Sequence, residues 1–495
     1  MAESTHEGIE IGEQQMLRAL SIFILLNISS AVFAQPNIVF IFADDLGVGD
    51  VGAYGGATID TPHIDALASA GVLFEQAYAS HPVCSPSRAG LMTGRYQQRH
   101  GWEFNPAARI ETSGMDPEQL TLADMLKESG YTTGMVGKWH LGYLPQFHPL
   151  NRGFDHYFGV LAGGSIFIDQ SRPDVESIGN WPSKRDSSKG VYDGHKLIEV
   201  EDYLTDVFTD RAVDFIKQKH QAPFFLYLSH TTPHTPLQAT KKYTSRYQHI
   251  TNPAARIYAA MVASLDDSVG AVVAALRETN QLDNTLIVFS SDNGCAGYIQ
   301  VCSNAPFKGF KRHHNEGGIR VPLIFSWPGR LAAGNYPHMV SLLDLMATFG
   351  GLAKSAYQTE DSVDLMPYLS SNTGQPHEYL YWRSSPTRAI RDQRWKLLQY
   401  AKSPYAVTEL DAARRISPPK AGWPRQAQKG YLTMLYDLQN DPGERDNLAA
   451  SHPAIVSRLQ SAFDKWNREL PQHSILPAQR STVVEMHGET VQLIF

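Results

Sequence analysis

Cysteine is scarce in this chain, which has only Cys84, Cys295 and Cys302 among its 495 residues. So few cysteines exclude the disulfide framework that holds many small secreted proteins together. Cys295 and Cys302 are close enough in the sequence to close one local loop, although the sequence alone leaves their pairing open. Cys84 would then have no cysteine partner, and its presence requires an explanation other than a structural disulfide.

Several other features are missing. The sequence has no basic block, heptad run, internal repeat or low-complexity segment, and its formal net charge is -7. This composition argues against nucleic acid and against a coiled-coil partner. The single N-x-S/T sequon, at Asn27, lies in a segment that we expect to be removed. Its position fits a bacterial exported protein better than a glycosylated eukaryotic one.

The N-terminal segment has the pattern of an export signal. An apolar run at residues 19–33 follows a polar stretch and ends at Ala34. The run is short for a membrane span and is interrupted by polar residues, so cleavage after Ala34 is favoured over stable membrane insertion. We therefore expect residues 1–34 to be a signal peptide with an upstream extension, and the mature protein to be periplasmic or secreted.

The length of the chain exceeds one ordinary core, which predicts a large domain at 35–355 and a smaller one at 356–495. Apolar residues at helical spacing, clearest at 257–276, predict helices that cover a sheet. The predicted fold class is α/β, with a large mixed and mostly parallel sheet sandwiched by helices. A smaller C-terminal α+β subdomain should hold a small antiparallel sheet and a final helix. Strands buried in the large sheet are predicted at 37–43, 132–137, 224–229 and 285–290.

Oxygen-rich residues follow two of these strands. Asp44 and Asp45 come after the first, and Asp292 and Asn293 come after the last. Each pair could simply cap a turn, but the ligands of open α/β sheets gather at the carboxyl ends of the strands. Three carboxylates and one amide are hard oxygen ligands that suit Ca²⁺, or less well Mg²⁺, rather than zinc. We therefore predict one metal site formed by these four residues.

Cys84 stands at the start of a predicted helix. Because Pro86 is preset for the first turn, Cys84 should lie at a helix N-terminus, where free N–H groups favour negative charge. A small buried cysteine is the common alternative. The run Cys84-Ser85-Pro86-Ser87-Arg88, followed by Leu91-Met92-Thr93-Gly94-Arg95, resembles the signature of the type I sulfatases, a family of the alkaline phosphatase superfamily. The resemblance implies that a maturation enzyme oxidises Cys84 to formylglycine (3-oxoalanine).

The resemblance continues at later positions. Lys138 and His140 lie in a Gly-Lys-Trp-His-Leu-Gly segment, and His234 lies in Pro-His-Thr-Pro. Counting back from the block that begins at Glu316 selects Lys311 as the remaining lysine of the family pattern. The chain departs from that pattern where larger residues replace small ones, at Arg312, His313, His314 and Asn315.

The resemblance also implies a mechanism. It implies an alkaline phosphatase-like fold and hydrolysis of sulfate esters by a formylglycine hydrate, with bound Ca²⁺. Arg88 and the cation would stabilise the nucleophile, while Lys138 and Lys311 would hold sulfate oxygens and His140 would assist expulsion of the sulfate. Either His234 or Lys311 would protonate the leaving group, and the sequence leaves both open.

The substrate is inferred from a long insertion and from export. The insertion, at about 163–200, is expected near the site, and an exported enzyme meets polymers. We therefore expect a sulfated carbohydrate, an algal or other polysaccharide or its oligosaccharides. Aromatic and imidazole side chains beside the presumed pocket loops are the candidates for substrate contact, although each could instead be a packing residue. They are Trp102, Trp181, Tyr192, His195, His313 and His314.

Two other functions remain open at this point. A phosphonate or phosphate diester hydrolase of the same superfamily can share the modified cysteine and the metal. A non-catalytic carbohydrate-binding relative would keep the ligand sites without turnover, although the intact set of candidate catalytic residues argues against it. A comparison of sulfate release with phosphodiester hydrolysis distinguishes a sulfatase from the first alternative. Carbohydrate binding without turnover would identify the second alternative.

Overall fold

The structure is a computed structural model of the chain. It describes residues 35–106, 114–371, 374–384, 387–402, 430–471 and 481–494. The predicted signal peptide, 1–34, lies outside the described residues. Pro36–Phe495 forms one compact unit, so both predicted domains of the mature chain belong to it.

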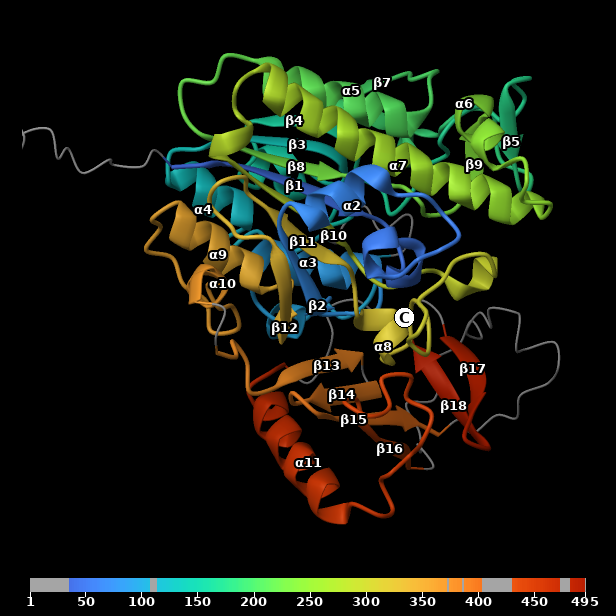
Figure 1. The fold of residues 1–495 in the computed structure, drawn as a ribbon, viewed down its shortest axis with the longest axis vertical. Coiled ribbons are helices and arrows are strands. Elements are labelled where there is room, and N and C mark those ends of the chain that lie inside the picture. Colours follow the sequence, from blue (N-terminus) through green and yellow to red (C-terminus); the bar gives the residue numbers. More distant parts are fainter. Residues whose placement is uncertain are drawn as a thin grey trace, which may run out of the picture. The chain divides into compact units, whose positions relative to one another are not determined.

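A ten-stranded mixed sheet is the largest element of this unit (Figure 1). Its strand order is β12-β2-β11-β10-β1-β8-β3-β4-β6-β7. The strands are β1 (Asn37–Ala43), β2 (Val72–Tyr78), β3 (Thr132–Lys138), β4 (His156–Val160), β6 (Val191–Asp193), β7 (Lys196–Ile198), β8 (Phe224–Ser229), β10 (Thr285–Ser291), β11 (Leu323–Ser326) and β12 (Gly334–Ser341).

The middle of the sheet is parallel. β1 pairs in parallel with β8 on one side and with β10 on the other, and β3 continues the parallel run between β8 and β4. β11 runs antiparallel between β10 and β2, and β6 and β7 form an antiparallel edge. The central strands are buried almost throughout, as expected of strands that are covered on both faces. The predicted mixed, mostly parallel sheet is confirmed.

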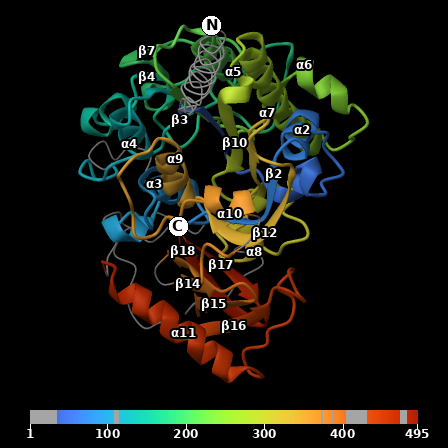
Figure 2. The same cartoon turned by 60° about the vertical axis from the view of Figure 1, so that its left-hand side comes forward.

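Alternate residues of β1 face two apolar layers. Phe40 and Phe42 pack in the layer that contains residues of α3, α4 and α9, whereas Val39 and Ile41 pack in the layer that contains residues of α2, α5 and α7. Figure 2 shows α4 and α9 on one side of the central strands and α2 and α7 on the other. The helices are α2 (Pro62–Ser69), α3 (Cys84–Thr93), α4 (Leu122–Glu128), α5 (Leu204–Lys217), α6 (Lys241–Thr244), α7 (Pro253–Glu278), α8 (Glu316–Ile319), α9 (Asp344–Leu352), α10 (Met366–Ser371) and α11 (Pro453–Arg468).

The C-terminal part contains the predicted small antiparallel sheet. Its order is β13-β14-β15-β16, and α11 packs on it through a cluster that includes Leu397, Leu435 and Phe463. Two further two-stranded sheets, β5 with β9 and β17 with β18, were not expected from the sequence. The additional strands are β5 (Val175–Ser177), β9 (Gln238–Thr240), β13 (Leu380–Ser384), β14 (Thr387–Arg391), β15 (Trp395–Ala401), β16 (Tyr431–Asp437), β17 (Ser481–Met486) and β18 (Glu489–Ile494).

Two local features of the fold follow directly from residue type. Thr121 caps α4 in a reciprocal capping box with Asp124. The apolar helix α7 has the length and composition of a membrane span, but 72% of its apolar window is buried within the fold, which makes it a core helix.

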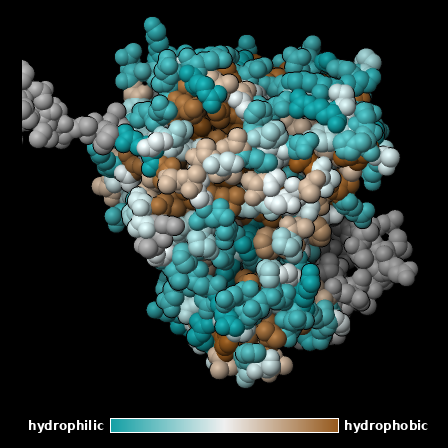
Figure 3. Space-filling model, viewed as in Figure 1, coloured by the Kyte–Doolittle hydropathy of each residue, from teal (hydrophilic) through white to brown (hydrophobic). Residues whose placement is uncertain are grey.

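The surface seen in Figure 3 is mainly hydrophilic, with scattered apolar patches. The exposed large apolar side chains of the described residues are Ile178, Leu197, Tyr298 and Phe310.

Candidate active site

The candidate site lies at the carboxyl ends of the parallel strands. Asp44 and Asp45 follow β1, Lys138 ends β3, and Asp292 follows β10. Because these strands are parallel neighbours, or neighbours through β8, their carboxyl ends meet at one edge of the sheet. His234 belongs to the loop after β8. The sheet therefore gathers residues that are as far apart in sequence as 44 and 292.

Cys84 is the first residue of α3 and points into this cluster. Its Sγ lies 3.0 Å from Lys311 Nζ and 3.4 Å from Asp44 Oδ1. Val83 before it is extended, which matches the predicted helix start, and all residues of α3 are buried. Burial, and then the charge of Asp292, raises the pKa of the Cys84 thiol well above its usual value. The unmodified thiol is therefore protonated, and a protonated thiol is a poor nucleophile.

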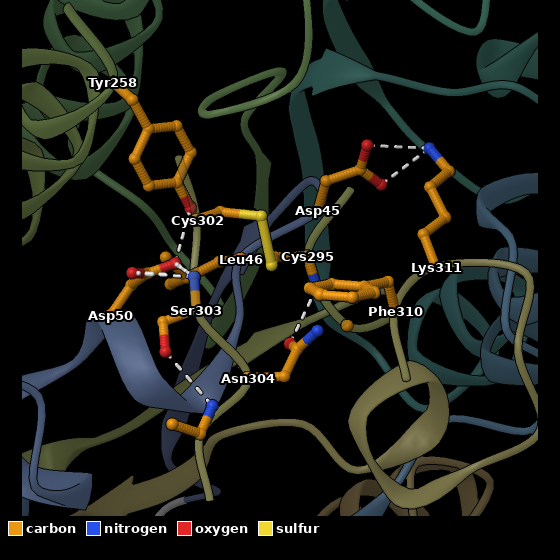
Figure 4. The surroundings of a disulfide bond; sticks show 12 residues. Asp45, Leu46, Asp50, Tyr258, Cys295, Cys302, Ser303, Asn304, Phe310 and Lys311 are labelled. Atoms are coloured by element: carbon orange, nitrogen blue, oxygen red, sulfur yellow. Dashed lines mark hydrogen bonds and ion pairs between the residues drawn. A yellow bond between two sulfur atoms is a disulfide. The ribbon is translucent and has the colours of Figure 1, made fainter. Parts of the chain in front are cut away.

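Each buried carboxylate in the site faces a buried cation. Lys138 Nζ lies 2.7 Å from Asp44, and Arg88 donates to Asp292 at 2.8 Å. Lys311 Nζ points at both oxygens of Asp45, as Figure 4 shows, and lies 2.6 Å from Oδ1.

The two neighbouring aspartates differ in their electrostatics. Burial raises the pKa of Asp44 to about 7, even though the charge of Lys138 opposes the rise. Burial acts in the same direction on Asp45, but there the charge and hydrogen bond of Lys311, together with the charges of His234 and Lys138, outweigh burial and lower the pKa.

The residues predicted to bind a metal lie together, and one of their oxygens has no partner. The Asn293 side chain donates to Asp45 Oδ1 at 2.7 Å, while its own Oδ1 is buried without a hydrogen-bond donor. Asp292 Oδ1 accepts the backbone N–H of Asp45 at 3.1 Å. Ligand atoms of Asp44, Asp45, Cys84 and His234 lie within 4.8 Å of one another. The unpartnered amide oxygen and the buried carboxylates fit a hard cation such as Ca²⁺.

The two candidate histidines lie beside the cluster. The His234 Nδ1–H donates to the carbonyl oxygen of Thr235 at 2.7 Å, so Nε2, which lies 3.6 Å from Asp45, faces the site. Burial, followed by the charge of Lys311, lowers the pKa of His234 to about 3. His140 is buried, and its φ of 63° is uncommon for histidine. His230, which follows β8 directly, instead pairs with Ser268 Oγ at 2.9 Å, and this contact indicates a structural role.

A cavity of about 600 Å³ opens beside these groups. His140, His234 and Lys311 line it together with residues 162–166 and 181–189 from the predicted insertion. This volume is in the usual range for small-molecule sites, about 300 to 1,000 Å³. The cavity therefore has room for more of a substrate than the group that reacts.

The four residues predicted from sequence to bind substrate do not line this cavity. Trp102 is buried in the core and donates to Ser85 Oγ at 2.9 Å, and His314 is buried beside Ser384. His195 packs on His148 with ring centroids 4.3 Å apart, and His313 accepts the backbone N–H of Phe310 at 3.3 Å. Their role in substrate binding stays a prediction, and the contacts of these four side chains within the protein favour the alternative that they are packing residues.

Of the other two aromatic candidates, Trp181 lines the cavity and Tyr192 does not. Tyr298 and Arg312 also line it, although neither was predicted from the sequence to contact substrate. Arg312 had a signal, since it departs from the family pattern. Tyr298 lies in η9 (Gly297–Ile299), inside the loop closed by a Cys295–Cys302 disulfide, and nothing in the sequence marked it.

Comparison with known proteins adds independent findings. Residues 36–355 match the family model described as Sulfatase. The N-acetylgalactosamine-6-sulfatase of Mus musculus is 32% identical over 488 residues, covering 94% of this chain and 91% of the relative. The N-acetylgalactosamine-6-O-sulfatase of Bacteroides thetaiotaomicron is 28% identical and covers 87% and 93%. The crystal structure of Ps i-CgsB in complex with k-i-k-neocarrahexaose aligns with a TM-score of 0.75 at 34% identity, covering 89% of this chain and 94% of that one.

Proposed function

Since this chain belongs to the sulfatase family and is a sulfuric ester hydrolase, we propose that its substrate is a sulfated carbohydrate, an algal or other polysaccharide or one of its oligosaccharides. The observation that carries the proposal is the cavity beside Cys84, which extends along the insertion well beyond the reacting groups. The names of several relatives, which refer to sulfated sugars or to a bound oligosaccharide, support the same class. The predicted signal peptide supports action in the periplasm or outside the cell.

The nucleophile is a formylglycine formed from Cys84 by a maturation enzyme. Support comes from the signature around Cys84 and from the buried, protonated state of the unmodified thiol. The hydrated aldehyde supplies the hydroxyl that attacks sulfur. Asp44, Asp45, Asp292 and Asn293 would hold Ca²⁺, which would supply positive charge to stabilise the nucleophile and the sulfate.

The protein's own groups orient the sulfate and manage the protons. Lys138 and Lys311 project into the cluster from different elements, so they hold sulfate oxygens and fix the ester in line for attack. Arg88 anchors Asp292 through two hydrogen bonds from its guanidinium. His234 presents Nε2 to the site. The negative charge of a bound sulfate favours the protonated imidazole, and in that state His234 donates a proton to the leaving alcohol, with Lys311 the alternative donor. His140 lies on the cavity wall and assists expulsion of sulfate.

A screen of sulfated oligosaccharides tests the function. The matured protein is incubated with carrageenan, ulvan, fucoidan and glycosaminoglycan fragments, and free sulfate and the desulfated position are followed. We expect at least one class to be turned over far better than a small aryl sulfate, and Cys84→Ala to release no sulfate. Efficient turnover of aryl sulfates alone would contradict the carbohydrate assignment.

Two further measurements test the chemistry. Peptide mass spectrometry should show the aldehyde at Cys84 in active protein, and full activity with an unmodified thiol would refute the mechanism. Matched kinetics on sulfate and phosphodiester model substrates test the alternative of a phosphonate or phosphate diester hydrolase. Sulfate monoesters and phosphate diesters make a matched pair because they are close in charge and size. We expect the sulfate ester to be preferred because the chain belongs to the sulfatase family.

A further inference from the structure

We propose that Arg312 and Tyr298 form a subsite for a second anionic group of the substrate, beside the position of the sulfate that is removed. The inference rests on the proposed function and narrows it. The carbohydrate selected by this chain would carry a further sulfate or a carboxylate near the scissile sulfate.

The two side chains form a stacked pair on the wall of the active-site cavity. Both line it together with Lys311, which Arg312 follows directly in the chain. The guanidinium carbon of Arg312 lies 4.9 Å from the centroid of the Tyr298 ring. A guanidinium that stacks on an aromatic face presents its N–H groups along its edge, where they can bind two oxygens of an anion at once. The Tyr298 side chain is 42% exposed, so the pair lies where a ligand can reach it.

The backbone around Arg312 is fixed in a conformation that favours glycine. Its φ is 82°, in the left-handed region that non-glycine residues seldom adopt. The Arg312 N–H donates to the carbonyl oxygen of Pro82 at 2.7 Å, and the Lys311 N–H donates to that of Cys295 at 2.9 Å. These bonds tie Arg312 to the chain just before Cys84 and to the disulfide loop. The Arg312 backbone is thereby held close to the nucleophile, and the stack on Tyr298 orients the guanidinium.

The disulfide holds the other member of the pair. Cys295 and Cys302 close a loop with a sequence separation of 7, and Tyr298 lies within it. Figure 4 shows this disulfide next to the Asp45 and Lys311 pair of the active site. Closing so short a loop removes most of its alternative conformations, so the aromatic face is preorganised for the guanidinium.

The charges around the cavity favour a ligand with more than one negative charge. Its lining contains five lysines and arginines but a single carboxylate, that of Asp186. Two of these cations have other roles: Arg185 donates to three backbone carbonyls of the insertion, and Lys184 lies 3.8 Å from Glu199. Arg312 is the cation adjacent in sequence to Lys311, so a second anion bound there would lie close to the scissile sulfate.

Ligand binding tests the subsite without any need for turnover. In the Cys84→Ala background, affinities are measured by calorimetry for sulfated disaccharides. Three disaccharides are compared: one carries a single sulfate, one carries two sulfates, and one carries a sulfate and a uronate carboxylate. We expect the doubly charged sugars to bind about 10-fold to 100-fold more tightly than the singly sulfated one, as for a hydrogen-bonded charge pair. The two doubly charged arms show whether the second anion is a sulfate or a carboxylate.

Variants then assign the preference to Arg312. Arg312→Gly removes the guanidinium in a conformation that suits glycine, and Arg312→Gln keeps the side-chain length without the charge. Both should reduce the preference to about 2-fold or less while leaving the affinity for the singly sulfated sugar within about 2-fold. Arg211→Gln is the matched control, because Arg211 also stacks on an aromatic ring, 4.5 Å from the Phe158 centroid, but does not line this cavity.

The possible failures are distinguishable. Equal affinities in the parent, no binding of the doubly charged sugars, or a preference that survives in both Arg312 variants would overturn the subsite. Sulfate release by the matured protein would still support the proposed function in those cases. Absence of sulfate release from every ester by aldehyde-bearing protein would overturn the proposed function itself.

Discussion

Trp382 of β13 donates its indole N–H to the carbonyl oxygen of Ala79, 2.8 Å away. Ala79 directly follows β2 and precedes Cys84 by a short loop. In that loop His81 Nε2 lies 2.5 Å from Ser384 Oγ, at the end of the same small-sheet strand. The C-terminal sheet therefore supports the segment that carries Cys84, and it is part of what shapes the active site.

Lys396 should be essential for the attachment of this sheet. Its buried Nζ lies 2.9 Å from Glu316 of α8 and 3.0 Å from Glu444. Lys396→Met leaves these carboxylates buried without their shared cation, so we expect a loss of about 3 to 5 kcal/mol in unfolding free energy. Urea denaturation monitored by tryptophan fluorescence measures this loss of unfolding free energy.

Lys402 provides the matched control for that variant. It pairs with Glu489 at 2.6 Å, but both side chains are partly exposed, at 29% and 43%. Lys402→Met should therefore cost only about 0 to 1 kcal/mol. Equal losses in the two variants would show that the buried network does not hold the sheet in place.

Metal removal should weaken both stability and activity. We expect one Ca²⁺ per chain by elemental analysis, a lower melting temperature after chelation, and recovery when calcium is returned. Asn293→Ala removes the unpartnered amide oxygen and should weaken calcium binding by about 10-fold or more. Protein that contains zinc, or whose melting temperature is unaffected by chelation, would contradict the assignment.

The leaving-group acid can be identified from the reactivity of substrates. Loss of the acid matters most when the leaving alcohol is a weak acid, so a series of aryl sulfates with rising phenol pKa separates the two donors. We expect His234→Ala to lose more activity, by about 10²-fold or more, as the phenol pKa rises. Lys311→Ala should lower activity by a similar factor across the series, because its main task is to hold sulfate. The opposite pattern would assign the proton to Lys311.

Asp50 should make stability depend on pH. Burial raises its pKa from 3.8 to about 7, although Ser303 N–H and the Tyr258 hydroxyl donate to it. The folded chain then keeps a proton on Asp50 that the unfolded chain releases near pH 4. Stability contributed by this group is therefore present below pH 4 and declines as the pH rises towards 7.

The neutral variant Asp50→Asn isolates that contribution. Relative to Asp50→Asn, the wild-type melting temperature should fall between about pH 4 and pH 7 and level off above that, with a linkage of about 1.4 kcal/mol per unit of pKa shift. Asp283→Asn, at an exposed position, is the control and should show no such trend. A difference between wild type and Asp50→Asn that is constant with pH would refute the assignment.

The sequence predicted those parts of the molecule that local pattern determines. Residues 37–43 form β1 because a continuous apolar run suits a strand covered on both faces, and Cys84 begins α3 ahead of Pro86. The hairpin of β17 and β18 was missed although its signal is local, since the two-residue turn His487-Gly488, with both φ angles positive, joins the two strands.

The site was predictable where strand ends set positions and unpredictable where loops do. Asp44 and Asp292 were expected to meet because parallel strands bring their carboxyl ends together. The cavity wall depends instead on how loops pack. For that reason Trp102 lies in the core and Tyr298, held by a disulfide that the sequence left open, lies on the wall.

The complete burial of α3 imposes an order on the biosynthesis of this protein. Cys84 is 1% exposed, and the helix it begins has no residue on the surface. A second enzyme cannot bind the peptide around a side chain that the sheet and the small C-terminal sheet already enclose. Under the proposed mechanism, oxidation of Cys84 would therefore have to precede closure of the fold, and chains that fold before they meet the maturation enzyme would remain inactive although correctly folded.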